Sequence, residues 1–284
     1  MHRGCGISRN QRSASLHRLC RGSGEASSAA LSRGPCPMNL SELIQKLLLA
    51  GVDLALCQAI LTWPHFSLTS YAMVSSLARQ GINPRTVIDV GANVGQFAVA
   101  AAKLFPGAQV HSFEPQRACI ERLQRYATPL GIKVYPVGLG DRKAELLFHY
   151  NRHSHSSSFL NLSAKHLSAF PDAQSSFSEV LTVSTLDHEL RGIEWRSPAL
   201  LKLDVQGFEG NVLRGATQSL PKIDFVVAEG SLSPLYEGEI PFGELVDLMR
   251  TSGYRFLRPV GWITSPRTSE ILQMDALFER SQAS

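Results

Sequence analysis

Val87–Phe97, VIDVGANVGQF, combines an apolar run with an acid and two glycines, a pattern that suits a backbone closely approached by a ligand. Asp89 lies two residues before Gly91, and Gly95 follows four residues later. Gly91 permits a tight bend after a strand, and Gly95 can open a helix whose N-terminus faces the ligand. A dinucleotide fingerprint would read G-x-G-x-x-G. Because the acid repels a pyrophosphate and suits an ammonium group, a ligand with amino and carboxylate ends fits better than NAD.

Two further acids follow later apolar runs. Glu114 ends HSFE, 23 residues after Gly91, near the spacing of about 20 at which an acid accepts hydrogen bonds from ribose hydroxyls. Asp141 ends VGLGD and can accept from an adenine amino group. Each feature alone is compatible with a plain turn or a helix cap. Together, and in this order, they predict a site for S-adenosylmethionine.

These acids need parallel strands whose carboxyl ends meet at one edge of a sheet. Apolar runs rich in β-branched residues alternate with helical patterns from residue 85 onward, which predicts right-handed crossovers and a parallel sheet. The expected strands are 86–90, 108–113, 133–139, 199–205 and 223–229, with helices at 95–105, 118–131, 207–220 and 241–253. Residues 254–260 and 274–280 are expected to form a final antiparallel pair.

A long polar segment, 151–177, interrupts this alternation between strand-like runs at 144–150 and 179–184. Loops of this length in compact domains are often lids or binding loops. His153 and His155 lie in it, and histidine titrates near neutral pH, so either can serve as a base. The alternative is that both are simply solvated in a serine-rich loop.

The run 199–205 places Lys202 and Asp204 on one face, because side chains alternate along a strand. Asp204 would stand at the carboxyl end, where it can take a proton from an acceptor hydroxyl, hold that hydroxyl, or only orient the cofactor. Lys202 would lie deeper and need a carboxylate partner. Glu229 ends the next strand and is a second candidate for base or substrate contact, or else a cap. Two carboxylates without a third ligand are weak evidence for a metal, so none is expected.

The sequence resembles the FkbM family of S-adenosylmethionine-dependent methyltransferases over residues 85 to 280. The resemblance implies a doubly wound, Rossmann-like, seven-stranded and mostly parallel sheet of the class I methyltransferase type. It also implies O-methylation of a sugar or small natural product and substrate or lid contacts from the serine-rich stretch with His155, Ser157 and Ser158. The motifs that carry it are VIDVGANVGQFA (87–98), HSFEPQ (111–116), VGLGD (137–141), VSTLDHEL (183–190), LLKLDVQGFEGNVLRGA (200–216) and MDALFER (274–280). The implied cofactor contacts are Asp89, Gly91, Asn93, Gly95, Glu114 and Asp141.

One position departs from that family pattern, which usually has Glu where this chain has Gln206. The change removes a carboxylate beside the expected active edge. It leaves open a catalytically weak or inactive module that binds S-adenosylmethionine on the same fold. A nucleotide-sugar or NAD enzyme on the same sheet is a third possibility, opposed by the missing third glycine.

Composition bounds the remaining questions. With 44% apolar and 18% charged residues, the chain is typical of a globular protein. Its basic charge comes from residues 1–37, which contain six arginines and one acid, so nucleic acid is not an expected partner. We expect an Arg/Ser-rich disordered leader (1–37, from a transit peptide or an upstream start), a helical cap (38–83) and a methyltransferase domain (84–284). Five cysteines without a metal or disulfide spacing favour reduced thiols and a cytoplasmic location.

Overall fold

The computed structural model describes residues 54–151, 157–163, 167, 175–265 and 269–281, all of which lie within Gln45–Ser284. The leader 1–37, residues 38–53 of the expected helical cap, and both histidines of the long loop lie outside the described residues. The boundary expected at 83/84 stays a prediction. Helix α3 (Leu68–Arg79), on its N-terminal side, contacts both α4 (Gln96–Leu104) and a strand of the main sheet.

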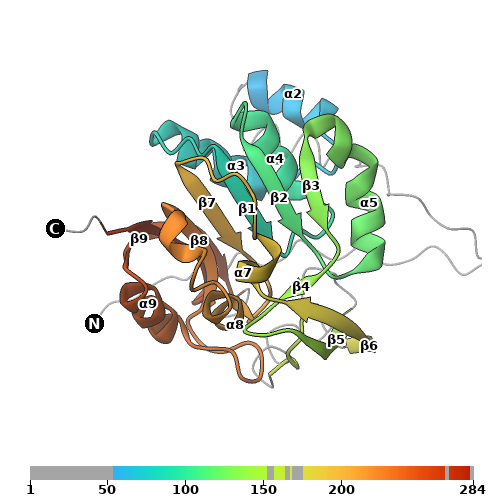
Figure 1. Ribbon diagram of the computed structural model, residues 1–284, viewed down its shortest axis with the longest axis vertical. Coiled ribbons are helices and arrows are strands. Elements are labelled where there is room, and N and C mark those ends of the chain that lie inside the picture. The colour runs from blue at the N-terminus through green and yellow to red at the C-terminus, as the bar shows by residue number, and fades with distance from the viewer. Residues whose placement is uncertain (1–53, 152–156, 164–166, 168–174, 266–268, 282–284) are drawn as a thin grey trace, which may run out of the picture. The chain divides into compact units, whose positions relative to one another are not determined.

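Seven strands form the main sheet in the order β3-β2-β1-β7-β8-β10-β9 (Figure 1). Only β10 runs antiparallel to its neighbours, and the order reverses between β1 and β7. This arrangement confirms the doubly wound, Rossmann-like sheet and the final antiparallel pair. The bounds are β1 Thr86–Val90, β2 Gln109–Phe113, β3 Ile132–Tyr135, β7 Ala199–Leu203, β8 Phe225–Ser231, β9 Tyr254–Thr264 and β10 Ile271–Arg280.

Helices cover both faces of the sheet, and an apolar cluster is buried on each face. On one face α3, α4 and α5 (Arg117–Ala127) pack over Val87, Leu200 and Val227. On the other, α7 (Leu186–Glu189), α8 (Glu209–Arg214) and α9 (Phe242–Thr251) contribute to a second cluster. Helix α2 (Leu54–Thr62) precedes them.

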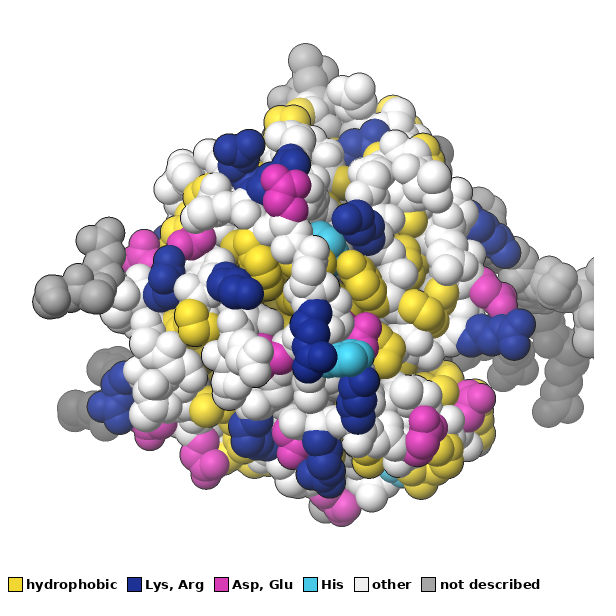
Figure 2. All heavy atoms as spheres, in the orientation of Figure 1, with side chains coloured by type: hydrophobic (Ala, Val, Ile, Leu, Met, Phe, Trp, Pro, Cys, Tyr) yellow, Lys and Arg dark blue, Asp and Glu magenta, His cyan; other side chains and the backbone are white. Residues whose placement is uncertain are grey.

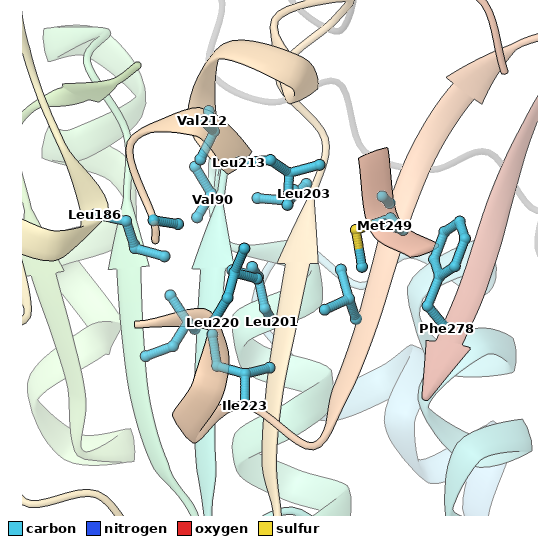
Figure 3. Packing of buried hydrophobic residues seen from close by; sticks show 14 of the residues in the cluster. Val90, Leu186, Leu201, Leu203, Val212, Leu213, Leu220, Ile223, Met249 and Phe278 are labelled. Atoms are coloured by element: carbon cyan, nitrogen blue, oxygen red, sulfur yellow. The ribbon is translucent and has the colours of Figure 1, made fainter. Parts of the chain in front are cut away.

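The second cluster accounts for the apolar side chains on one face of strands β1 and β7. Val90, Leu201 and Leu203 project from the sheet toward Leu213 of α8 and Met249 of α9 (Figure 3). Each fully buried aliphatic side chain contributes roughly 1.5–3 kcal/mol. This packing holds the carboxyl ends of β1 and β7 in place, where the sequence predicts the site.

Two sequence-based predictions of elements are wrong. The expected strand 133–139 is divided at Pro136, which lacks a backbone N–H, and only its first half joins the main sheet. Its second half, β4 (Gly138–Leu139), pairs in a separate sheet with β6 (Ser175–Ser184), which also pairs with β5 (Ala144–Asn151). The expected helix 207–220 is only the short α8. It ends at Gly215, where a Cβ would lie 2.0 Å from the oxygen of Gly140.

The surface gives little indication of function. Lys and Arg, Asp and Glu, and apolar side chains are interspersed over the face in Figure 2. No helix within the described residues has both the length and the apolar character needed to cross a membrane.

Candidate active site

A cavity of about 630 Å³ opens at the carboxyl ends of β1, β2, β7 and β8, at the reversal of strand order. Its size lies in the range of small-molecule sites. It brings together six of the predicted residues from separate parts of the chain. They are Gly91, Asn93, Glu114, Ser157, Asp204 and Glu229.

The glycine loop forms one wall of the cavity. Gly91 and Asn93 have positive φ angles of 80° and 49°, which turn the chain sharply after β1. A Cβ at Gly91 would lie 1.9 Å from the backbone oxygen of Asp204, so only glycine lets this loop lie against the end of β7. The N–H groups of Gly91 and Ala92 both donate to the oxygen of Phe113 at 3.0 Å.

Glu114 is buried at the tip of β2 with its carboxylate on the cavity wall. Its Oε2 accepts from the N–H of Asn93 at 2.7 Å, and its Oε1 accepts from the N–H of Gln116 at 2.8 Å. Burial raises the pKa of Glu114 to about 7, although these two N–H groups act in the opposite direction. Each oxygen keeps a second lone pair, so the carboxylate can still accept ligand hydroxyls.

Three predicted cofactor contacts do not line this cavity. Asp89 is fully buried behind the wall, and its carboxylate has no hydrogen-bond partner among the described residues. Burial raises the pKa of Asp89 to about 6, with Lys202 opposing the shift. Gly95 begins α4 against Leu123. Asp141 is exposed, pairs with Arg142 at 3.2 Å and lines a separate hollow, so its position does not support the predicted adenine contact.

Lys202 and Asp204 form the expected pair on the floor of the cavity. The Nζ of Lys202 donates to Oδ2 of Asp204 at 2.7 Å and lies 5.5 Å from the ring centre of Phe97. Burial disfavours the ammonium, but Asp204 and Asp89 outweigh it and raise the pKa of Lys202. The positive charge of Lys202 therefore compensates most of the negative charge of Asp204.

Glu229 and Asp275 form a second acidic pair beside the first. They are directly opposite each other on β8 and β10, and both line the cavity. Burial, together with Asp204, raises the pKa of Glu229 well above its usual value and that of Asp275 to about 6. Sequence reasoning missed Asp275, although an acid within the mostly apolar MDALF was a usable signal.

Gln206 connects the two predicted catalytic carboxylates. Its Nε2 donates to Oδ1 of Asp204 at 2.7 Å and to Oε2 of Glu229 at 2.9 Å. Consequently Asp204 has both oxygens engaged, whereas Oε1 of Glu229 has no hydrogen-bond partner among the described residues.

The long loop reaches this site through its serines. Ser157 lines the cavity and accepts from the N–H of Asn151 at 3.0 Å, while Ser158 is buried and donates to the oxygen of Gln206 at 2.7 Å. His155 lies outside the described residues. In the part of the chain that the structure describes, no group of three or more His, Cys, Asp or Glu side chains is arranged to hold a metal.

The site as a whole can bind a hydroxylated ligand and remove a proton. Glu114 offers acceptors for hydroxyls at one end. At the other, Glu229 offers a carboxylate oxygen with no hydrogen-bond partner among the described residues, and burial raises its pKa, which makes the ionised form a stronger base.

Comparisons with known proteins agree on one family. The profile of the FkbM methyltransferase domain matches residues 89–256. The 2-O-methyltransferase NoeI of Sinorhizobium fredii is 30% identical over 172 residues, covering 57% of this chain and 70% of that protein.

Two solved structures are more distant. One is the 1,6-didemethyltoxoflavin-N1-methyltransferase of Burkholderia thailandensis, with 10% identity, a TM-score of 0.42, and coverage of 89% of this chain and 94% of that one. The other is a TehB-like methyltransferase of Corynebacterium glutamicum, with 11% identity, a TM-score of 0.42, and coverage of 85% and 96%. Likenesses this weak add nothing to the strand order already described.

Proposed function

Because this chain belongs to the FkbM family of S-adenosylmethionine-dependent methyltransferases, we propose that it methylates a hydroxyl oxygen of a sugar or another small polyhydroxylated molecule. Methyl transfer and the cofactor follow from the family. The choice of oxygen and of acceptor is the proposal. The observation that carries it is that Glu229 lines the cavity and that its Oε1 has no hydrogen-bond partner among the described residues.

The cavity suits S-adenosylmethionine. We assign Glu114 to the ribose hydroxyls and the apolar side chains of Phe113 and Val137 to the adenine ring, because all three line the cavity. The orphaned carboxylate of Asp89 behind the wall adds negative potential under a cationic ligand. When bound, the cofactor supplies an electrophilic methyl carbon and departs as the neutral thioether.

Glu229 is the residue that we assign as base. Its Oε1 accepts the proton of the acceptor hydroxyl while the hydroxyl oxygen forms its new bond to carbon, and the carbon–sulfur bond pair remains on sulfur. Asp204 is a weaker base, because both of its oxygens are bound and Lys202 neutralises it. We assign Asp204 to orientation of Lys202 and Gln206.

The acceptor class is supported by the surroundings of Glu229. Asp275 provides a second carboxylate directly opposite, so neighbouring hydroxyls of one molecule can each find an acceptor. Trp262, 60% exposed, and Ile263 give the cavity an apolar rim. A sugar ring presents hydroxyls at its edge and C–H groups on its faces, which matches both features. The 2-O-methyltransferase activity named for NoeI is also transfer to oxygen.

An acceptor screen tests this proposal. Purified protein is incubated with S-adenosylmethionine and panels of methyl glycosides, amines and carboxylic acids, and products are identified by mass spectrometry. We expect O-methylated glycosides, and a fall in kcat of about 10²-fold or more for Glu229→Gln, as for loss of a general base. Glu237→Gln, at an exposed position nearby, is the matched control. Methylation confined to amines, or full activity of Glu229→Gln, would reject the proposal.

We also propose that the protein works in the reducing cytoplasm. Cys57 and Cys119 are free thiols. Burial raises the pKa of Cys119 to about 12, and its Sγ donates to Oδ1 of Asn93 at 3.3 Å, so this thiol stays protonated and unreactive beside the site. Localisation of a tagged full-length chain tests this proposal.

A further inference from the structure

We propose that Gln206 is a positioning residue that holds Asp204 and Glu229 in one arrangement and leaves Oε1 of Glu229 open to the cavity. The inference rests on the proposed function only in naming Glu229 as the base. It gives a role to the one position at which the chain departs from the family pattern.

The amide of Gln206 is bound at both ends. One nitrogen donates to a carboxylate oxygen of Asp204 and to one of Glu229, so these oxygens lie within about 5 Å of each other. Its Oε1 accepts from the hydroxyl of Tyr236 at 2.7 Å. The reverse orientation of the amide would set its oxygen against two carboxylates, so only this one satisfies every group.

The backbone of Gln206 is held as firmly as its side chain. Its φ of 57° is uncommon for a residue with a side chain, and Ser158 binds its carbonyl oxygen. Tyr236 is 1% exposed and packs against the next residue, Gly207, where a Cβ would lie 2.9 Å from the tyrosine ring. Local strain retained by surrounding contacts is frequent at functional sites.

Charge explains why an amide suits this position. Lys202 is already paired with Asp204, so a third carboxylate at position 206 would have no cation to meet among the described groups around it. The two hydrogens of the amide instead attract both carboxylates without adding charge. The titratable groups around the amide are Lys202 from β7, Asp204 directly after β7, Glu209 from α8, Glu229 from β8, Tyr236 and Glu239 from the following loop, and Asp275 from β10.

A first experiment requires no acceptor. Thermal unfolding of Gln206→Glu, wild type and Gln124→Glu is measured from pH 5.5 to 8; Gln124 is exposed on α5, so it receives the same change in charge away from the site. We expect the Tm deficit of Gln206→Glu to widen as pH rises, because the added carboxyl must keep a proton to remain beside its neighbours. A deficit that stays parallel to that of Gln124→Glu overturns the inference.

A second experiment separates positioning from a purely structural role. Tyr236→Phe keeps Gln206 but removes the donor that orients its amide. With an acceptor from the screen, we expect kcat to fall at least tenfold, its acid limb to shift by about one pH unit, and the Kd for S-adenosylmethionine to change less than twofold. An unchanged pH profile overturns the inference. If no acceptor is found, the proposed function fails, while the unfolding experiment still decides the role of Gln206.

Discussion

At the scale of residues, Glu114 links cofactor affinity to pH. Its pKa is raised to about 7, and in the proposed contact with ribose only the ionised carboxylate can accept from two hydroxyls while keeping its two N–H bonds. Binding therefore favours the ionised form and releases a proton. We expect the Kd for S-adenosylmethionine to rise as pH falls below about 7, by up to tenfold per unit. Calorimetric titration in buffers of different ionisation enthalpy measures both quantities.

Glu114→Gln provides the decisive comparison. Hydrogen bonds to a charged acceptor contribute about 1.5–3 kcal/mol, so the variant should bind at least tenfold more weakly at pH 8 and lose most of the pH dependence. Glu121→Gln, exposed on α5 and paired with Arg117, should bind like wild type. A Kd for Glu114→Gln that matched wild type at pH 8 would contradict the ribose assignment.

Some site residues could be predicted from the sequence because their place along a strand brings them to the site. Others reach the site only through contacts with distant parts of the chain. Gly91, Asn93, Glu114 and Asp204 follow strand ends, and Glu229 lies near the carboxyl end of β8, so the fold alone brings them to one edge. Asp275 lies inside a strand and reaches the site only because β10 runs antiparallel beside β8. The role of Gln206 depends on Tyr236, thirty residues later, which no local pattern indicates.

At the scale of elements, periodic runs predicted β1, α4, β2, α5 and the final strand pair, because each is local and buried. The wrong predictions concern elements whose bounds are set by contacts between distant parts of the chain. Residues 133–139 have the sequence pattern of one continuous strand. In the structure the chain is divided at Pro136, and the two halves join different sheets. The helix after β7 is short because Gly215 is pressed against Gly140, a contact between distant segments.

Ser158 connects the long loop to the active site. The hydroxyl of Ser158 donates to Gln206 and accepts from the N–H of Leu160 at 3.0 Å, so Ser158→Ala frees the described part of the loop and leaves a carbonyl unsatisfied. We expect about 1 kcal/mol less stability, faster hydrogen exchange at 157–163, and a higher KM for the acceptor at unchanged cofactor Kd. Ser178→Ala, exposed on β6, is the control. Exchange at 157–163 as slow as in wild type would contradict this.

At the scale of the whole molecule, buried acids outnumber the cation that they surround. Burial raises the pKa of Asp89 and Asp275 to about 6, that of Glu114 to about 7, and that of Glu229 well above its usual value. A carboxyl whose pKa is higher in the folded than in the unfolded chain stabilises the fold below about pH 4, and this stability is lost as pH rises through the folded value. Asp224, whose pKa is lowered, acts in the opposite direction only at more acid pH.

We therefore expect the free protein to lose stability steadily from pH 5 to pH 8. Asp89 alone, whose pKa is raised to about 6, corresponds to a loss on the order of 3 kcal/mol. Thermal unfolding at constant ionic strength measures the trend, and Glu229→Gln should raise Tm more at pH 8 than at pH 5, whereas Glu237→Gln should not. A cationic cofactor should likewise stabilise the protein more at pH 8, because it meets ionised acids there. A Tm that stays constant or rises from pH 5 to pH 8 would mean that the pKa values of these acids are not raised. The cavity would then lack the excess negative charge that we expect to attract the cationic cofactor.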